Sequence, residues 1–297
     1  MTPRAFALAP AKINIGLEVT GRRSDGFHDV VSILQTVSLY DRLELSACQG
    51  GYRYESPAGI DSADDLVRKA FDVAPDRSIW EGRLRLHKEI PVAAGLGGGS
   101  SDAALALKIA YPDVHRDALV HLSADLGSDV PFFLEGGTSL GTGIGTDLKR
   151  LPHLDAWCVI VTPRFVIPNK TRSLYASLTA EDCSDGGTVR HIADRLGTGG
   201  AIDTCPPNAF TRPLMKHPPI QAARDALRIA GAAWVSVSGA GPSLYTLVTE
   251  YRIAKSIADR VPPSVGKIFI ARTLPRRHHH LAAENLARLL RGGQTSR

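Results

Sequence analysis

The feature that most constrains this chain is a glycine-rich segment that runs directly into a stretch of helical composition. The segment reads Ile-Pro-Val-Ala-Ala-Gly-Leu-Gly-Gly-Gly-Ser-Ser-Asp over residues 90–102, and alanine and leucine dominate residues 103–110. Glycine has no Cβ, so the backbone of such a loop can approach a ligand closely. A helix over 103–110, with Ser100 or Ser101 as its N-cap, would add unpaired N–H groups and a positive dipole end. The segment therefore predicts a site for phosphate groups.

Two common phosphate-binding patterns do not describe this loop. No Gly-Lys-Ser/Thr follows the glycines, as a Walker A loop requires, and the third glycine of a dinucleotide fingerprint would fall on Ser100. A second turn of small residues lies at 238–243, in the other half of the chain. Two glycine turns in separate halves predict a ligand that is held between two domains.

The length of 297 residues suits about two domains. We expect a border at Leu151-Pro152, which gives domains 1–151 and 152–275 and a basic tail, 276–297. The order of elements predicts an α+β fold. We expect strands at 11–19, 30–40, 42–47, 83–88, 157–161, 233–237, 244–248 and 267–272, helices at 64–73, 103–110, 116–126, 220–230 and 252–261, a loop over 180–207 and a short amphipathic helix at 281–291.

Charge and composition exclude several classes of protein. The net charge is +5, and residues 272–297 alone carry +5, so a basic groove for nucleic acid is not expected across the fold. The six arginines of that tail leave open the hypothesis that it binds RNA or an acidic partner. No apolar run is long enough for a transmembrane helix. The four scattered cysteines form no Cys-x-x-Cys pair and indicate a reducing, cytoplasmic setting.

Two charged residues are candidates for catalysis. Lys12 lies among apolar residues in the strand expected at 11–19, and a buried ammonium needs a partner. Asp129 precedes Val130-Pro131, where the proline ring restricts the backbone. A carboxylate and an ammonium brought together beside phosphates would suit the deprotonation of a hydroxyl group.

Five segments, in this order along the chain, resemble the GHMP kinase superfamily from about residue 8 to residue 273. The resemblance implies a two-domain GHMP kinase fold, with an N-terminal domain like ribosomal protein S5 domain 2 and a ferredoxin-like C-terminal domain. The Pro-Ala-Lys-x-Asn and Asp-Gly-Phe-His pieces narrow it to members that phosphorylate a cytidine diphosphate-linked methylerythritol on its 2-hydroxyl, in the non-mevalonate route to isoprenoid precursors. The segments are 9–15, 23–28, 91–104, 126–133 and 238–242.

The resemblance also implies roles for individual residues. Asp129 would be the general base and Lys12 its electrostatic partner, and Mg²⁺ would accompany ATP, with Ser101 as a candidate ligand. ATP would lie on Pro91, Val92, Ala93, Ala94, Gly95, Leu96, Gly97, Gly98, Gly99, Ser100 and Ser101. The small-molecule substrate would contact Asn14, Phe27, His28, Thr171, Tyr175 and Gly239.

Within this set, His28 would hydrogen-bond the edge of the cytosine, and Phe27 and Tyr175 would stack on its face. Phe27 stands where the family often has tyrosine. Residues 168–171 carry two residues more than the family spacing. The oligomeric state is left open between a monomer and a homodimer.

Two other functions compete with this one. A homoserine or mevalonate kinase would not need the element at 25–28, and binding of a cytidine nucleotide would distinguish it. A regulator could keep the fold and the ATP site without catalysing transfer. The presence of both Lys12 and Asp129 argues against a regulator, and bound ATP that is never consumed would favour one.

Overall fold

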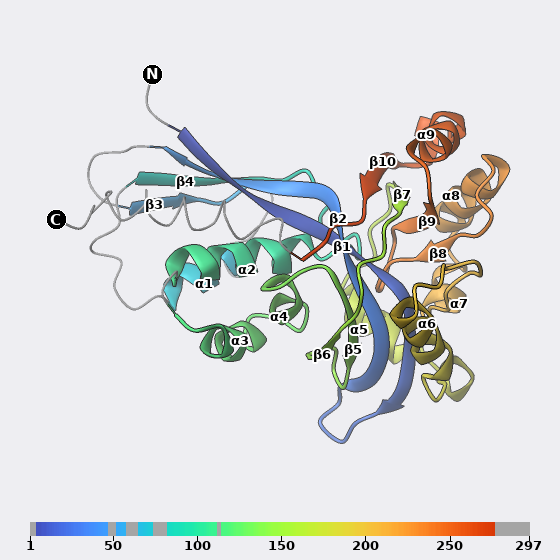
Figure 1. Cartoon of the computed structure of the whole chain (residues 1–297), viewed down its shortest axis with the longest axis horizontal. Helices are drawn as coiled ribbons and strands as arrows, with labels where there is room; N and C mark the ends of the chain where they lie inside the picture. The colour runs from blue at the N-terminus through green and yellow to red at the C-terminus, as the bar shows by residue number, and fades with distance from the viewer. Residues whose placement is uncertain (1–3, 47–51, 58–64, 74–81, 112–113, 277–297) are drawn as a thin grey trace.

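The computed structural model describes residues 4–46, 52–57, 65–73, 82–111 and 114–276, and within them the strands form two sheets (Figure 1). The first has six strands in the order β3-β4-β2-β5-β6, with β1 paired to β2 beside that path. The second has four strands in the order β10-β7-β9-β8. The α+β class is confirmed. The helix expected at 281–291 lies outside the described residues, as does the tail beyond residue 276.

A long antiparallel hairpin of β1 (Arg4–Arg22) and β2 (His28–Ser46) forms the centre of the molecule. The strand predicted at 11–19 is therefore longer than expected. The prediction of two strands at 30–40 and 42–47 is wrong, because β2 continues through Asp41. That carboxylate is fully buried and accepts hydrogen bonds from the backbone N–H groups of Glu89 and Ile90, at 2.7 and 2.9 Å. A satisfied polar side chain can remain inside a strand.

The rest of the first sheet carries helices on one of its faces, visible below the sheet in Figure 1. Side chains of the sheet and of these helices share one apolar cluster, which includes Leu43, Leu84, Leu107 and Phe132. The elements are β3 (Tyr52–Glu55), α1 (Leu66–Asp72), β4 (Gly82–His87), α2 (Gly98–Ala110), α3 (Arg116–Ala124), α4 (Val130–Phe133), β5 (Thr138–Thr142) and β6 (Asp147–Arg150).

The second sheet carries its own helices and a second apolar cluster. The predicted order of helix, strand, turn, strand, helix and strand over 220–272 is confirmed. The loop predicted over 180–207 is wrong in its middle part, because α6 buries Val189, Ala193 and Leu196 along one helical stripe. The elements are β7 (Trp157–Thr162), α5 (Lys170–Ala176), α6 (Gly187–Gly197), α7 (Thr211–Leu214), α8 (Pro218–Ile229), β8 (Ser236–Val237), β9 (Leu244–Val248), α9 (Tyr251–Arg260) and β10 (Lys267–Arg272).

A third apolar cluster joins the two sheets. It packs Ile13 and Ile33 of the hairpin against Ile160 of β7 and Tyr245 of β9. The Tyr245 hydroxyl also donates to the backbone oxygen of Asn14 at 2.9 Å. The hairpin thus contacts both halves of the molecule. None of the described helices is long and apolar enough to cross a membrane.

Candidate active site

The glycine loop opens directly into α2, as its composition predicts. The predicted N-cap at Ser100 or Ser101 is wrong, because Gly97 caps the helix in the left-handed conformation, with a φ of 70°, and both serines lie inside the first turn. Glycine adopts this conformation without steric cost, which lets the helix begin three residues earlier than a serine cap would. The first-turn N–H groups of α2, which have no acceptor within the helix, are therefore available to an anion.

The second small-residue turn packs against the first. The hydroxyl of Ser238 donates to the backbone oxygen of Gly95 at 2.9 Å. The two backbones are so close that a Cβ on Gly95 would lie 2.2 Å from the backbone oxygen of Ser238. Gly239 has a φ of +53°, and a Cβ there would lie 3.1 Å from Asn14 Oδ1. Glycine is thus required where the two halves meet.

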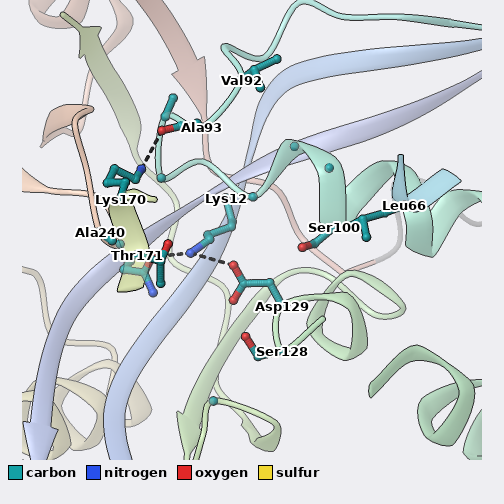
Figure 2. Close-up of a pocket in the computed structure, with 18 of the residues that line it drawn as sticks. Lys12, Leu66, Val92, Ala93, Ser100, Ser128, Asp129, Lys170, Thr171 and Ala240 are labelled. Carbon is teal, nitrogen blue, oxygen red and sulfur yellow. Dashed lines mark hydrogen bonds and ion pairs between the residues drawn. The ribbon is translucent and has the colours of Figure 1, made fainter. Parts of the chain in front are cut away.

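Lys12 and Asp129 form an ion pair at this junction. Lys12 Nζ lies 3.2 Å from Asp129 Oδ2, and it also donates to Asn14 Oδ1 at 2.5 Å (Figure 2). The Lys12 side chain is 5% exposed and that of Asp129 is 33% exposed. Asp129 is the N-cap residue of α4, but its carboxylate makes no capping bond there. One oxygen of Asp129 is therefore held by the buried lysine while the carboxylate as a whole remains accessible to a ligand.

This ion pair and residues of both turns line a cavity of about 940 Å³. Four of the residues predicted for the site, Leu96, Ser101, Phe27 and His28, are not part of its lining. Leu96 and Ser101 are buried in the protein instead. The predicted residues that do line the cavity are Lys12, Asn14, Pro91, Val92, Ala93, Ala94, Gly95, Gly97, Gly98, Gly99, Ser100, Asp129, Thr171, Tyr175 and Gly239.

The predicted base-binding residues are only partly assembled. The rings of His28 and Tyr175 are stacked, with their centroids 4.7 Å apart, and Tyr175 meets Phe210 edge-on. Burial, and then the Asp129 charge, raise the pKa of Tyr175 to about 12. Burial, and then Arg22, lower the pKa of His28. Phe27 is 61% exposed, outside this stack.

Sequence reasoning missed a lysine that lines the cavity. Lys170, the first residue of α5, donates to the backbone oxygens of Ala93 and Gly241. Burial and the nearby Lys12 lower the pKa of Lys170 to about 8. The only sequence signal for it is the extra length at residues 168–171, which places a basic residue directly before Thr171.

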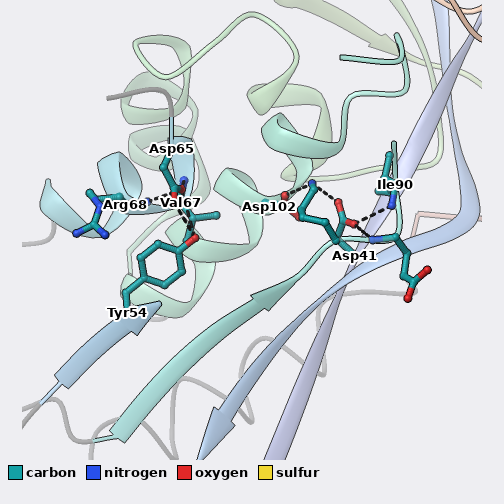
Figure 3. A network of polar contacts seen from close by, with 9 residues as sticks. Asp41, Tyr54, Asp65, Val67, Arg68, Ile90 and Asp102 are labelled. Atoms are coloured by element: carbon teal, nitrogen blue, oxygen red, sulfur yellow. Dashed lines mark hydrogen bonds and ion pairs between the residues drawn. The ribbon is translucent and has the colours of Figure 1, made fainter. Parts of the chain in front are cut away.

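A second missed group lies under the start of α2. The ammonium of Lys88 is shared between two buried carboxylates, with Asp102 at 2.6 Å and with Asp41 in a close contact (Figure 3). Burial, only partly offset by Lys88, raises the pKa of Asp102 to about 8. Lys88, Asp102 and Asp65 also line the cavity.

The site combines a glycine loop at a helix start, a second glycine turn packed against it and a lysine–aspartate pair beside both turns, and the family models assign the chain to the class of GHMP kinases. Comparison with known proteins agrees with this class. Residues 65–137 match the model of the GHMP kinases N terminal domain, and residues 210–268 match that of the GHMP kinases C terminal domain.

The particular family follows from closer relatives. The 4-diphosphocytidyl-2-C-methyl-D-erythritol kinase of Dehalococcoides mccartyi is 34% identical over 280 residues, which cover 90% of this chain and 97% of that protein. The enzyme of the same name from Pelotomaculum thermopropionicum is 35% identical over 281 residues, with the same coverage. The chain belongs to the 4-diphosphocytidyl-2-C-methyl-D-erythritol kinase family.

Solved structures agree with this assignment. A crystal structure of 4-(cytidine 5'-diphospho)-2C-methyl-D-erythritol kinase superimposes with a TM-score of 0.77 at 31% identity, over 90% of this chain and 98% of that one. The homoserine kinase of Cytophaga hutchinsonii shares the fold alone, with a TM-score of 0.66 at 16% identity, over 92% of this chain and 96% of its own.

Proposed function

We propose that this chain transfers the γ-phosphoryl group of ATP to the 2-hydroxyl of 4-diphosphocytidyl-2-C-methyl-D-erythritol, in the non-mevalonate route to isoprenoid precursors. Asp129 is the general base and Lys12 is its electrostatic partner. The observation that carries the proposal is the 3.2 Å pair of Lys12 and Asp129 in a cavity that the phosphate-binding loop also lines.

The chemistry requires one proton transfer and one phosphoryl transfer. The hydroxyl oxygen attacks the γ-phosphorus while its proton passes to Asp129, and the bond to the β-phosphate oxygen breaks, which releases ADP. Lys12 keeps the carboxylate oriented and offsets negative charge on the group in transfer. General base catalysis contributes about 10²–10⁴-fold, and positioning and electrostatics supply the remainder.

Mg²⁺ is expected to enter with ATP, because in kinases it keeps several waters and is bound by substrate phosphates with one or two carboxylates. The described residues contain no cluster of three or more His, Cys, Asp or Glu side chains that could hold a metal ion by themselves. Three carboxylates line the cavity, but Asp102 is paired with Lys88 and Asp65 caps α1, which leaves Asp129 and the hydroxyls of Ser100 and Ser128 beside the loop (Figure 2). This sparse oxygen set fits a metal ion that phosphates carry, and Ser100 replaces the buried Ser101 as the candidate serine ligand.

The cytidine end of the substrate would lie beside Tyr175. Its ring is already half-enclosed by Phe210 and stacked on His28, so an aromatic base could take up the same stacking. In this arrangement His28 moves off the Tyr175 face to hydrogen-bond the base edge, and Phe27 closes over the base. Asn14 and Thr171 would contact the polyol or the diphosphate.

The proposal also covers the cellular location, the domain organisation and the oligomeric state of the chain. The relatives are bacterial metabolic enzymes, and Cys158, Cys183 and Cys205 are free thiols, which suits a reducing cytoplasm. We keep the division at residue 151 and the separate tail, 276–297, as the proposed domain organisation. A monomer and a homodimer fit the proposal equally well.

The test is a direct assay of the purified chain with ATP, Mg²⁺ and the diphosphocytidyl substrate. The expected products are ADP and the 2-phosphate ester in equal amounts. Homoserine and mevalonate, offered as alternative acceptors, should give no ADP above background. Absence of turnover with the cytidine substrate at every Mg²⁺ concentration would overturn the proposal, as would preference for either alternative acceptor.

A further inference from the structure

Lys170 lies where the two glycine turns meet, and the reaction described above leaves it without a role. Its ammonium donates to the backbone oxygen of Ala93 at 2.6 Å and to that of Gly241 in a close contact. Ala93 belongs to the loop that leads into α2, and Gly241 belongs to the second turn. A single side chain thus holds one carbonyl from each half of the chain. Figure 2 shows it reaching Ala93 at the edge of the cavity.

These two bonds do not exhaust the hydrogen-bonding capacity of Lys170. An ammonium group has three N–H donors, so the two carbonyls leave a third donor for a ligand in the cavity that Lys170 lines. In the described part of the chain, no carboxylate forms an ion pair with Lys170 within 4.0 Å. Carbonyl dipoles solvate the cation without neutralising it.

The charge environment indicates what that ligand should be. Burial and the positive charge of Lys12 both lower the pKa of Lys170, so its ammonium is poorly hydrated and close to a second cation. Asp129, the carboxylate at this end of the cavity, pairs with Lys12 rather than with Lys170. An anion bound between the two lysines would compensate both for the burial of the Lys170 ammonium and for its repulsion by Lys12.

We propose that Lys170 binds a phosphate oxygen of ATP through its third N–H donor while it holds the two turns together. Phosphate is also present in the diphosphate of the second substrate. ATP is favoured because Ala93 lies in the loop that continues into the phosphate-binding helix start. The inference deepens the proposed function and depends on it only for the choice of ATP as the nucleotide.

The experiment is a set of equilibrium titrations with ATP, ADP, adenosine and CDP. The proteins are the wild-type chain, Lys170→Met, Lys170→Arg and the control Lys267→Met, which removes an exposed lysine at the start of β10, outside the cavity lining. Lys170→Met should weaken ATP binding by roughly 10- to 100-fold, the loss expected for a hydrogen bond to a charged group. Adenosine and CDP should bind as to the wild type. Lys170→Arg should restore most of the ATP affinity because a guanidinium keeps the charge.

Three results would overturn the inference. The first is unchanged ATP binding by Lys170→Met. The second is an equal loss of ATP and adenosine binding together with a lower Tm, which would mean that Lys170 only supports the two turns. The third is weaker binding of CDP with ATP unaffected, which would place the phosphate contact on the other substrate.

Failure of the proposed function gives a different pattern. These titrations do not depend on turnover, so a chain that binds ATP through Lys170 but does not phosphorylate the cytidine substrate contradicts the function alone. A chain that turns over normally, and whose Lys170→Met variant binds ATP like the wild type, contradicts the inference alone.

Discussion

The lowered pKa of Lys170 should make ATP binding depend on pH. Its value of about 8, against the usual 10.5, means that the ammonium loses its proton as the pH rises through 8. A bound phosphate favours the charged form, so ATP affinity should fall as the pH rises from 7 to 9. Lys12, from β1, is the charged group that acts on Lys170, and Lys12 is in turn paired with Asp129.

Calorimetric titration of ATP across this pH range checks this prediction. Arginine stays protonated throughout, so Lys170→Arg should show a flatter profile than the wild type. Equal slopes for the two proteins would show that another group is responsible for the pH dependence.

At the scale of single residues, the sequence predicts the pair at the centre of the site but not its surroundings. Lys12 is conspicuous because it is a charge within an apolar strand, and Asp129 because a rigid proline follows closely. Lys170 and Lys88 are not conspicuous, since each occurs in a polar segment where a solvated lysine is ordinary. Lys170 contacts Gly241, which is 71 residues away in the sequence, and Lys88 contacts Asp41, which is 47 residues away. Their roles depend on these long-range contacts.

At the scale of elements, the packing of the two glycine turns gives a prediction about Gly95. Its φ is +80°, and a Cβ there would lie 2.2 Å from a backbone oxygen of the other turn. Gly143 has a φ of +63° but open space around its Cβ position, so Gly143→Ala is a matched control for backbone strain alone. That strain costs about 1–2 kcal/mol.

Gly95→Ala should therefore reduce the free energy of unfolding, measured in urea, by more than Gly143→Ala does. It should also raise the KM for ATP, which Gly143→Ala should leave unchanged. If the two variants behave alike in both measurements, the close packing of the turns does not matter for ATP binding.

The stability of the fold should depend on pH because Asp41 and Asp102, two buried carboxylates, share the ammonium of Lys88. Burial raises the pKa of Asp102 to about 8 in the folded chain, whereas an unfolded aspartate titrates near its ordinary value of 3.8. Unfolding therefore releases a proton between these two values, so Asp102 lowers the stability of the fold as the pH rises from 4 to 8. The ceiling is about 1.4 kcal/mol for each pH unit.

The variant Asp102→Asn removes this titration and leaves Lys88 paired with Asp41. Urea unfolding at pH 5 and pH 8 should show that the wild type loses more stability than Asp102→Asn between the two conditions. The same loss in both proteins would contradict the raised pKa.

Elements were predictable where a single local pattern decides them. Strands β9 and β10 match their predicted ranges because short apolar runs lie between clear breaks. Helix α6 was missed because glycines and polar residues surround its apolar stripe, which packs against the hairpin in the folded chain. The cap of α2 was assigned wrongly because a glycine cap leaves no sequence signal inside a run of glycines.

At the scale of the whole molecule, one cavity between the two halves predicts direct transfer. The glycine loop, the Lys12–Asp129 pair and four of the predicted substrate residues line the same space, so we expect ATP and the acceptor to be bound together. These four residues are Asn14, Thr171, Tyr175 and Gly239. Initial rates should then give intersecting lines when both substrates are varied. Exchange of label between ADP and ATP in the absence of the acceptor, or parallel lines, would indicate a phosphorylated enzyme instead.

The most direct test of the central claim is a single-turnover measurement on Asp129→Asn, beside Asp125→Asn as an exposed control outside the cavity lining. With ATP saturating and the enzyme in excess over the diphosphocytidyl substrate, removal of the base should slow phosphoryl transfer by at least roughly 100-fold. ATP binding should stay intact, and Asp125→Asn should react like the wild type. Transfer by Asp129→Asn at the wild-type rate would contradict the assignment of the Lys12–Asp129 pair as the centre of catalysis.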